Sequence, residues 1–323
     1  MENIYRVLSM WDSGIAAEVY DPLTGLAHLD IQPPDREFLL NHIGEYDVYL
    51  ATLHMPMDRQ VVERGAQGRL RLVYTPSTGL DHLDLEALDE FGIEMRCIKT
   101  EYDLLDNITA TAELACALML ASARKIPAAN QAACSGHWAR DVYRGMQLSG
   151  KTLGVLGVGR LGRMMVEYGR GLRMNVIGCD PHPLRPLADL EYLDFDAFAA
   201  RADVISMHIH LGPETEQFIN AERLQAMKDG VILVNTSRGR IIDETALADA
   251  IHSGKVGGFG ADVIDGEWLN DLVDHPLIAL SREHDNVVIV PHLGGVTVES
   301  QTVSHKFVVE RLAEILRTWP TPQ

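Results

Sequence analysis

The glycine-rich segment Gly157–Gly162 constrains the fold of this chain more than any other feature. Its sequence is Gly-Val-Gly-Arg-Leu-Gly, and it directly follows the apolar run Thr152–Leu156 and precedes a helical pattern. In such a strand–turn–helix unit, the first glycine permits a tight turn, the second lets the backbone approach a pyrophosphate, and the third lets the helix pack closely on the strand. The segment therefore predicts the phosphate-binding turn of a parallel α/β dinucleotide-binding domain.

The turn also predicts which groups hold the cofactor. These are the backbones of Gly157, Gly159 and Gly162 and the free N–H groups of Arg160 and Leu161 at the helix start. The next expected strand ends on Asp180, eighteen residues beyond the third glycine. A carboxylate there accepts hydrogen bonds from the adenosine ribose and repels a 2′-phosphate, which favours NAD over NADP. Arg185 leaves this choice open, because a nearby cation accepts a 2′-phosphate.

Short β-branched runs alternate with helical stretches along the chain, which predicts an α/β fold with parallel sheets covered by helices. The first block of expected strands contains Ile4–Met10, Asp47–Ala51, Leu70–Tyr74 and Glu94–Cys97. The second block contains Thr152–Leu156, Asn175–Cys179, Asp203–His208, Val231–Asn235, Phe259–Val263 and Val287–Val290. Between them, Thr109–Ala123 lacks Gly and Pro and predicts a long buried helix. The chain has 323 residues, enough for two domains.

Charge and cysteine usage narrow the classes of partner. A formal net charge of -18 repels phosphate backbones and acidic lipids, so we expect neither nucleic acid nor a membrane as a partner. No apolar run approaches the ~20 residues of a membrane helix. The four cysteines lack metal-ligand spacing, which favours buried free thiols and no metal site. The N-terminus shows no basic segment followed by an apolar one, so we expect a cytoplasmic protein.

Ordered motifs between Thr75 and Thr297 resemble those of the D-2-hydroxyacid dehydrogenase family, and most of all its phosphoglycerate dehydrogenase-like branch. The shared segments are Ser77–Asp84, Ala112–Glu113, Gly136–Trp138, Leu148–Gly154, Gly157–Gly162, Asn235–Gly239, Asp243–Glu244, Ala261–Val263 with Glu267, and Pro291–Gly295. The resemblance implies a doubly wound Rossmann nucleotide domain, residues 105–296, inserted into a smaller flavodoxin-like α/β substrate domain of residues 1–104 and 297–323. It also implies an active-site cleft between the domains and a homodimer.

A last helix is expected over Glu299–Trp319. Its apolar side would consist of Val303, Phe307, Leu312 and Ile315. The helix follows the second block directly and would cross back to the first domain. Because the chain ends soon afterwards, we expect no regulatory domain of the kind that some family members carry.

Arg238, Glu267 and His292 are the expected catalytic residues for hydride transfer between a nicotinamide and a 2-keto or 2-hydroxy acid. An arginine fork suits a planar carboxylate and stabilises charge that develops on the neighbouring C2 oxygen. Arg238 directly follows an apolar strand, at the end where such sheets bind ligands. His292 would donate the proton during reduction and accept it during oxidation. Glu267 would orient the imidazole and favour its protonated form.

Further contacts are implied by the resemblance alone. Asp262 lies where family members hold the nicotinamide carboxamide, and Thr236, Ser237, Gly294 and Gly295 line the cofactor cleft. The backbone N–H groups of Ser77, Thr78 and Gly79 would share the substrate carboxylate with Arg238.

Departures from the family pattern concern the substrate. The family's usual Pro-Gly after Cys97 is replaced by the polar loop Ile98–Asp103. At two further positions where the family usually has proline, this chain has His210 and Trp268. These changes have two interpretations. They shape a pocket for a bulkier or more anionic substrate, in which Lys99 or His210 contacts a phosphate or phosphonate, or they are surface substitutions without a functional role. A second class of function also stays open, because the NAD-sensing C-terminal binding protein corepressors resemble this family and keep Arg, Glu and His.

Overall fold

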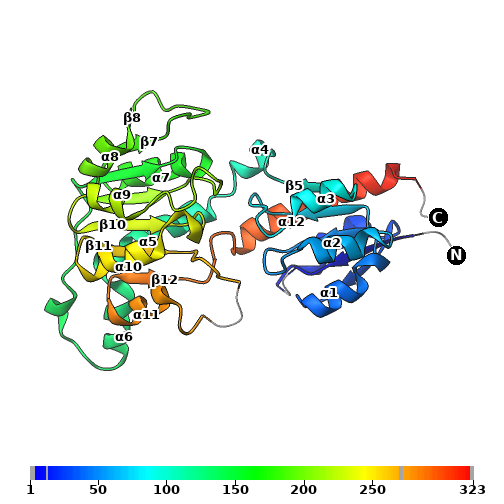
Figure 1. Cartoon of the computed structure of the whole chain (residues 1–323), viewed down its shortest axis with the longest axis horizontal. Coiled ribbons are helices and arrows are strands. Elements are labelled where there is room, and N and C mark those ends of the chain that lie inside the picture. The colour runs from blue at the N-terminus through cyan, green and yellow to red at the C-terminus, as the bar shows by residue number, and fades with distance from the viewer. Residues whose placement is uncertain (1–3, 12–13, 269–271, 321–323) are drawn as a thin grey trace. The chain divides into compact units, whose positions relative to one another are not determined.

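The computed structural model describes residues 4–11, 14–268 and 272–320. The chain forms two compact units (Figure 1). Unit 1 runs to Ile108 and resumes at Val298, and unit 2 spans Thr109–Thr297. Each unit contains a parallel sheet with helices, which confirms the predicted α/β class.

Unit 1 is built on five parallel strands in the order β2-β1-β3-β4-β5. They are β1 Tyr5–Ser9, β2 Ala27–Ile31, β3 Val48–Leu50, β4 Leu72–Thr75 and β5 Glu94–Cys97. The helices of this unit are α1 Arg36–His42, α2 Arg59–Ala66, α3 Leu85–Glu90, α4 Tyr102–Leu105 and α12 Val298–Thr318, with 3-10 turns η1 Ala17–Leu23 and η2 Ile43–Glu45. The sequence did not predict β2, because this edge strand mixes polar and apolar residues and buries neither face fully.

Helix α12 is the expected returning helix, and it packs against η1 of unit 1. Its predicted apolar side was partly wrong. Val303 is 42% exposed, whereas Ser304, Val308 and Leu312 are buried. A serine carries no apolar signal, so the sequence pattern began the buried face one residue too early.

Unit 2 contains a seven-stranded parallel sheet in the order β12-β11-β10-β9-β6-β7-β8. Its strands are β6 Thr152–Leu156, β7 Asn175–Cys179, β8 Glu191–Tyr192, β9 Val204–Met207, β10 Val231–Asn235, β11 Val256–Ala261 and β12 Val287–Ile289. Its helices are α5 Ala110–Arg124, α6 Ile126–Cys134, α7 Arg160–Gly171, α8 Phe195–Arg201, α9 Ala221–Ala226, α10 Glu244–His252 and α11 Pro276–Glu283, with 3-10 turns η3 Arg140–Tyr143 and η4 Gly239–Ile241. Strand order reverses between β6 and β9, which is the switch point of a doubly wound fold.

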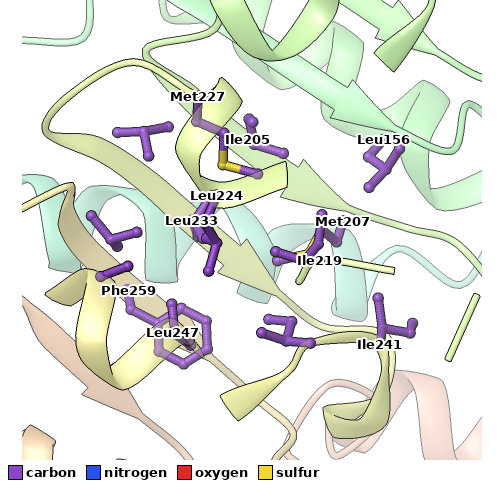
Figure 2. Packing of buried hydrophobic residues seen from close by; sticks show 14 of the residues in the cluster. Leu156, Ile205, Met207, Ile219, Leu224, Met227, Leu233, Ile241, Leu247 and Phe259 are labelled. Atoms are coloured by element: carbon purple, nitrogen blue, oxygen red, sulfur yellow. The ribbon is translucent and has the colours of Figure 1, made fainter. Parts of the chain in front are cut away.

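Two apolar layers cover this sheet. Figure 2 shows one of them, where Leu233 of β10 and Phe259 of β11 pack with Leu224 and Leu247 from the covering helices. On the other face, Val234 of β10 belongs to the core that α5 and α7 close. The central strands β9 and β10 are therefore buried on both faces, which explains their nearly continuous apolar sequences.

Helix α5 lies in an apolar stretch that is long enough to be compared with a membrane-spanning helix. The stretch Tyr102–Arg124 is long and apolar enough, by length and composition alone, to cross a membrane, so the expectation that the chain has no run of this length was wrong. In the structure, α5 lies against β10, β11 and α7, and Ala112, Ala115 and Met119 are buried there. Its apolar side is thus occupied by packing within unit 2.

Candidate active site

The carboxyl ends of six strands in unit 2 lie on one row of the sheet. In register, Leu156 of β6 pairs with Cys179 of β7 and with Met207 of β9, and Met207 pairs with Asn235 of β10. The row continues to Ala261 of β11 and Ile289 of β12. The segments that leave this edge carry the glycine turn, Asp180, Arg238, Glu267 and His292. The predicted cofactor and catalytic residues of unit 2 therefore share one edge.

The glycine turn has the steric features that a pyrophosphate site requires. Gly157 has φ +85°, and a Cβ there would lie 2.8 Å from the carbonyl oxygen of His208. A Cβ on Gly162 would lie 2.0 Å from the carbonyl oxygen of Gly157, so the start of α7 packs directly on the turn. By contrast, no described atom lies within 4 Å of a Cβ position on Gly159. Backbone atoms therefore pack closely against Gly157 and Gly162, whereas the space beside Gly159 is open. This arrangement fits a dinucleotide that approaches the N-terminus of α7.

Asp180 is fixed over this turn by two backbone donors. The N–H of Val158 donates to Oδ2 at 2.9 Å, and the N–H of His182 donates to Oδ1 at 3.0 Å. A half-buried carboxylate at the end of β7 fits the role of a ribose acceptor. Arg185 is exposed, and its carbonyl oxygen accepts a hydrogen bond from Arg163.

Glu267 and His292 form the predicted pair. The distance between Oε1 of Glu267 and Nδ1 of His292 is 2.9 Å, and only 13% and 15% of the two side chains are exposed. Because a carboxylate only accepts, Nδ1 is the donor in this bond, and Nε2 is left for proton exchange. The indole of Trp268 stacks on the imidazole, with ring centroids 5.3 Å apart and planes inclined by 28°. Trp268 thus lies beside the expected proton donor.

The backbone of His292 adopts an unusual conformation that Asp262 supports. Its φ is +52°, a left-handed value that a residue other than glycine adopts only when its surroundings impose it. The N–H of His292 donates to the carbonyl oxygen of Asp262, and the Asp262 carboxylate accepts from Leu293 N–H at 2.5 Å and Gly294 N–H at 2.9 Å. Burial raises the pKa of Asp262, and His292 and the two amides oppose that shift. The structure therefore adds to Asp262 a backbone-holding contact that sequence reasoning did not predict.

Gly294 is enclosed on the opposite side by Thr111. Thr111 Oγ1 donates to the carbonyl oxygen of Gly294 at 3.0 Å, and a Cβ on Gly294 would lie 2.8 Å from Asp262 Oδ2. Gly295 is exposed and has no such close neighbour among the described atoms. Of these two glycines, Gly294 is thus sterically required.

The Arg238 loop is held by Asn235, a residue of the shared motif Asn235–Gly239 for which no role in the site was predicted. Asn235 is fully buried, and its amide donates to the carbonyl oxygen of Arg238 at 2.9 Å. Its side-chain oxygen accepts from Ser237 N–H at 3.0 Å, and Ser237 Oγ donates to the Met207 carbonyl at 2.9 Å. Ser237 therefore ties β10 to β9. The Arg238 guanidinium is half-buried and donates to the Ser237 carbonyl.

Two buried polar atoms at the same edge find no hydrogen-bond partner among the described residues: Nδ1 of His208 and Oγ1 of Thr236. His208 Nε2 lies 2.8 Å from Ser206 Oγ. Burial lowers the pKa of His208 to about 4. Orphaned polar atoms beside a glycine turn fit a site that a polar ligand completes.

The predicted substrate-binding residues of unit 1 lie at the carboxyl ends of two adjacent strands. Ser77, Thr78 and Gly79 follow β4 and are half-buried, and Ser77 N–H donates to Thr75 Oγ1 at 3.3 Å. Lys99 follows β5 and is exposed. His210, in unit 2, is also exposed. The assignment of these residues to a substrate remains a prediction.

One of the four cysteines, Cys179, ends β7 at this edge. Cys179 is buried, Cys97 and Cys116 are half-buried, and Cys134 is exposed, so the prediction of burial was wrong for Cys134, which ends α6. Among the described residues, one group has the spacing of metal ligands: His252, Glu283 and His284. These residues lie at the ends of α10 and α11, where helices antiparallel to the strands reach the opposite edge of the sheet.

A doubly wound parallel sheet with a glycine turn at its switch point is the architecture of a dinucleotide-binding domain. Comparison with known proteins makes the class specific. Residues 116–294 match the model of the D-isomer specific 2-hydroxyacid dehydrogenase, NAD binding domain. The chain therefore belongs to the D-2-hydroxyacid dehydrogenase family, which confirms the resemblance inferred from its motifs.

Individual relatives carry several names. The chain is 36% identical over 286 residues to a D-3-phosphoglycerate dehydrogenase of Methanocaldococcus jannaschii, which covers 87% of this chain and 52% of that protein. It thus spans about half the length of that relative. It is also 36% identical to a hydroxypyruvate reductase of Thermotoga maritima, over 83% of this chain and 84% of that protein. A D-lactate dehydrogenase of Aquifex aeolicus, solved with NAD and lactic acid, superposes with a TM-score of 0.83 at 26% identity, covering 97% of this chain and 95% of the other.

Proposed function

We propose that this protein is an NAD-dependent dehydrogenase that interconverts a small 2-keto acid and the corresponding 2-hydroxy acid. The observation that carries the proposal is the Glu267–His292 pair, held at the sheet edge from which the glycine turn and Arg238 also depart. The names of the relatives, which include a phosphoglycerate dehydrogenase, a hydroxypyruvate reductase and a D-lactate dehydrogenase, support the same type of reaction.

In the direction of reduction, His292 supplies the proton. Nε2 donates it to the keto oxygen as a hydride adds to C2 and the π electrons of the C=O bond move to that oxygen. NADH, when bound, supplies the hydride. Glu267 accepts from Nδ1, which orients the ring and stabilises the imidazolium before transfer. In the direction of oxidation, neutral His292 accepts the hydroxyl proton.

Arg238 is the proposed partner of the substrate carboxylate. A guanidinium forms two parallel hydrogen bonds with a carboxylate and stabilises charge on a neighbouring oxygen. The amides of Ser77, Thr78 and Gly79 are proposed as further donors to the carboxylate. A local cation is needed because the chain carries a net charge of -18, which disfavours any anion.

The proposed cofactor site comprises the glycine turn, the first amides of α7, and Asp180. The Asp180 carboxylate, held by Val158 and His182, is the basis for preferring NAD over NADP. Thr236, Ser237, Gly294 and Gly295 are proposed to complete the site, and the unpartnered Thr236 hydroxyl among the described residues supports that role. Asp262 is proposed to reach the nicotinamide carboxamide in addition to holding its loop.

The direct test measures NADH oxidation with a panel of 2-keto acids: pyruvate, glyoxylate, hydroxypyruvate and a phosphorylated analogue. We expect turnover with at least one of them. In the His292→Ala variant, kcat should fall by about 10²–10⁴-fold while NADH binding is retained. Arg238→Ala should raise KM and lower kcat together, because the carboxylate and the developing oxyanion both lose a partner.

Two outcomes would contradict the proposal. A kcat equal to that of wild type in the His292→Ala variant would exclude His292 as the proton donor. NADH binding without turnover of any panel member would favour the NAD-sensing interaction protein instead.

Lys99 decides between substrate classes. If it meets a phosphate or phosphonate, Lys99→Ala should raise KM for the phosphorylated keto acid at least tenfold more than for pyruvate, because a second anionic group is what a lysine charge adds. An equal effect on both substrates would mark Lys99 as a solvated loop residue.

We further propose a cytoplasmic homodimer. All four cysteines are free thiols, which supports a reducing compartment. For the dimer, the support is an apolar surface on residues 126–143 of unit 2. Helix α6 buries none of its residues, and Ile126, Trp138 and Val142 are 51%, 86% and 62% exposed. Ile126 and Trp138 line a groove together with Leu120 and Tyr143, and contiguous apolar surface of this kind marks protein interfaces.

A further inference from the structure

A half-buried carboxylate–imidazole pair outside the proposed chemistry holds both backbone polar groups of a single residue, Asp265. Glu244 Oε1 accepts the N–H of Asp265 at 2.8 Å, and His275 Nε2 donates to the carbonyl oxygen of Asp265 at 3.0 Å. Glu244 Oε2 and His275 Nε2 are 3.2 Å apart, and 15% and 12% of the two side chains are exposed. We call Glu244, His275 and the Asp265 backbone the Asp265 clasp.

The clasp joins two segments that carry proposed catalytic residues. Asp265 lies two positions before Glu267, and Glu244 begins α10, five residues beyond Gly239. A Cβ on Gly239 would lie 2.1 Å from the Asp265 nitrogen and 2.1 Å from the Ile264 carbonyl carbon. The residue directly after Arg238 therefore packs on the Ile264–Asp265 peptide, whose N–H Glu244 holds.

Withdrawing the Glu244 carboxylate from water costs free energy, because the ionised form loses its hydration. Burial raises the pKa of Glu244, and the Asp265 amide and His275 oppose that shift. The other charged groups that face Glu244 are Asp265 and Glu267, both of which disfavour its ionised form. Buried ion pairs often add no net stability, and Nδ1 of His275 accepts the Leu277 N–H at 3.3 Å. The main consequence of this pair is therefore its hold on the Asp265 backbone.

We propose that Glu244 and His275 are positioning residues that set Glu267 in register with His292 and Arg238. This inference rests on the proposed function of that triad. By holding the N–H and the C=O of Asp265, the clasp fixes the two consecutive peptides on either side of this residue, and therefore where the Glu267 carboxylate meets Nδ1 of His292. Small displacements of such a group are costly, since a misplacement of ~1 Å lowers rates by about 10²-fold.

The test compares Glu244→Gln, Glu244→Ala, His275→Gln and His275→Ala with the control His252→Ala. His252 also faces a glutamate, Glu283 at 3.8 Å, but its side chain is 55% exposed. For the two alanine variants we expect kcat to fall about tenfold or more with the Kd for NADH unchanged. The fall in reduction rate at high pH should begin at lower pH, because a displaced Glu267 stabilises the imidazolium less. His275→Gln keeps a donor for the Asp265 carbonyl and should recover most of the lost rate.

A readout independent of turnover separates this inference from the proposed function. The His292 imidazole signal, assigned by its absence in His292→Ala, is recorded by NMR at a fixed pH. Clasp variants should move this signal away from its wild-type chemical shift, and His252→Ala should not, whether or not a substrate has been found. An unaltered His292 signal in folded Glu244→Gln and Glu244→Ala, with only the melting temperature lowered, would show that the clasp is merely structural. Absence of wild-type turnover would overturn the proposed function instead.

Discussion

At the scale of a residue, Asp180 is the side chain that we propose sets cofactor choice. Its two oxygens already accept from Val158 and His182, so the carboxylate is rigid before any ribose arrives. We expect wild type to bind NADH at least tenfold more tightly than NADPH, since one charge-assisted hydrogen bond contributes about 1.5–3 kcal/mol. Asp180→Asn, which keeps an acceptor but removes the charge, should narrow this ratio mainly by improving NADPH binding. Fluorescence titrations measure both constants, and equal binding by wild type would contradict the role.

His208 carries a pH dependence of stability. Burial lowers its pKa from 6.5 to about 4, so the folded chain keeps the ring neutral while the unfolded chain protonates it. The stability that this group contributes is complete above pH 6.5 and is lost as the pH falls toward 4, by up to a factor of about ten in the unfolding equilibrium per pH unit. Between pH 6.5 and pH 4, the melting temperature of His208→Gln should therefore fall less than that of wild type. Parallel curves for variant and wild type would show that His208 titrates normally.

At the scale of elements, the loop after β12 depends on a residue from the end of β11. Asp262 accepts two backbone N–H groups from Leu293 and Gly294, and with them it holds His292 in its left-handed conformation. Asparagine offers one oxygen acceptor, and its amide would face the second N–H. Removing one buried acceptor costs about 1–3 kcal/mol.

We therefore expect Asp262→Asn to lower kcat about tenfold or more and to lower the urea midpoint. The matched control is Asp243→Asn, because Asp243 caps α10 and asparagine caps equally well. Steady-state kinetics and urea unfolding measure both effects. A full rate in Asp262→Asn would show that the loop keeps its conformation without this contact.

For the whole molecule, the exposed surface of residues 126–143 predicts association. A double variant, Trp138→Ser with Val142→Ser, removes apolar groups that are 86% and 62% exposed. It should convert a dimer into a monomer without lowering the melting temperature of the monomeric chain, because neither side chain is buried within it. Light scattering after size-exclusion chromatography gives the mass, and a wild-type monomer at micromolar concentration would contradict the proposal. Leu184→Ser is the control, since Leu184 is 88% exposed and lies outside this surface.

Local sequence patterns were sufficient for most of the scaffold. Strands β6, β7 and β10 have the predicted bounds, because a parallel strand buried on both faces produces an apolar run that stops where burial stops. The glycine turn was predictable because only glycine tolerates φ +85° at Gly157 and the close contact at Gly162. Strands β2 and β8 were not predicted: β2 is half-polar at a sheet edge, and β8 has two residues.

The sequence by itself determined which residue types were available at the strand ends: a glycine turn, an arginine, a glutamate and a histidine. Only the tertiary structure decided how they meet. Parallel pairing brings β10, β11 and β12 into one register row, which places Glu267 2.9 Å from His292 although 25 positions separate them. The Asp265 clasp and the hold of Asp262 on the His292 loop leave no local signature. Each depends on hydrogen bonds between segments whose spacing in sequence says nothing of their distance in space.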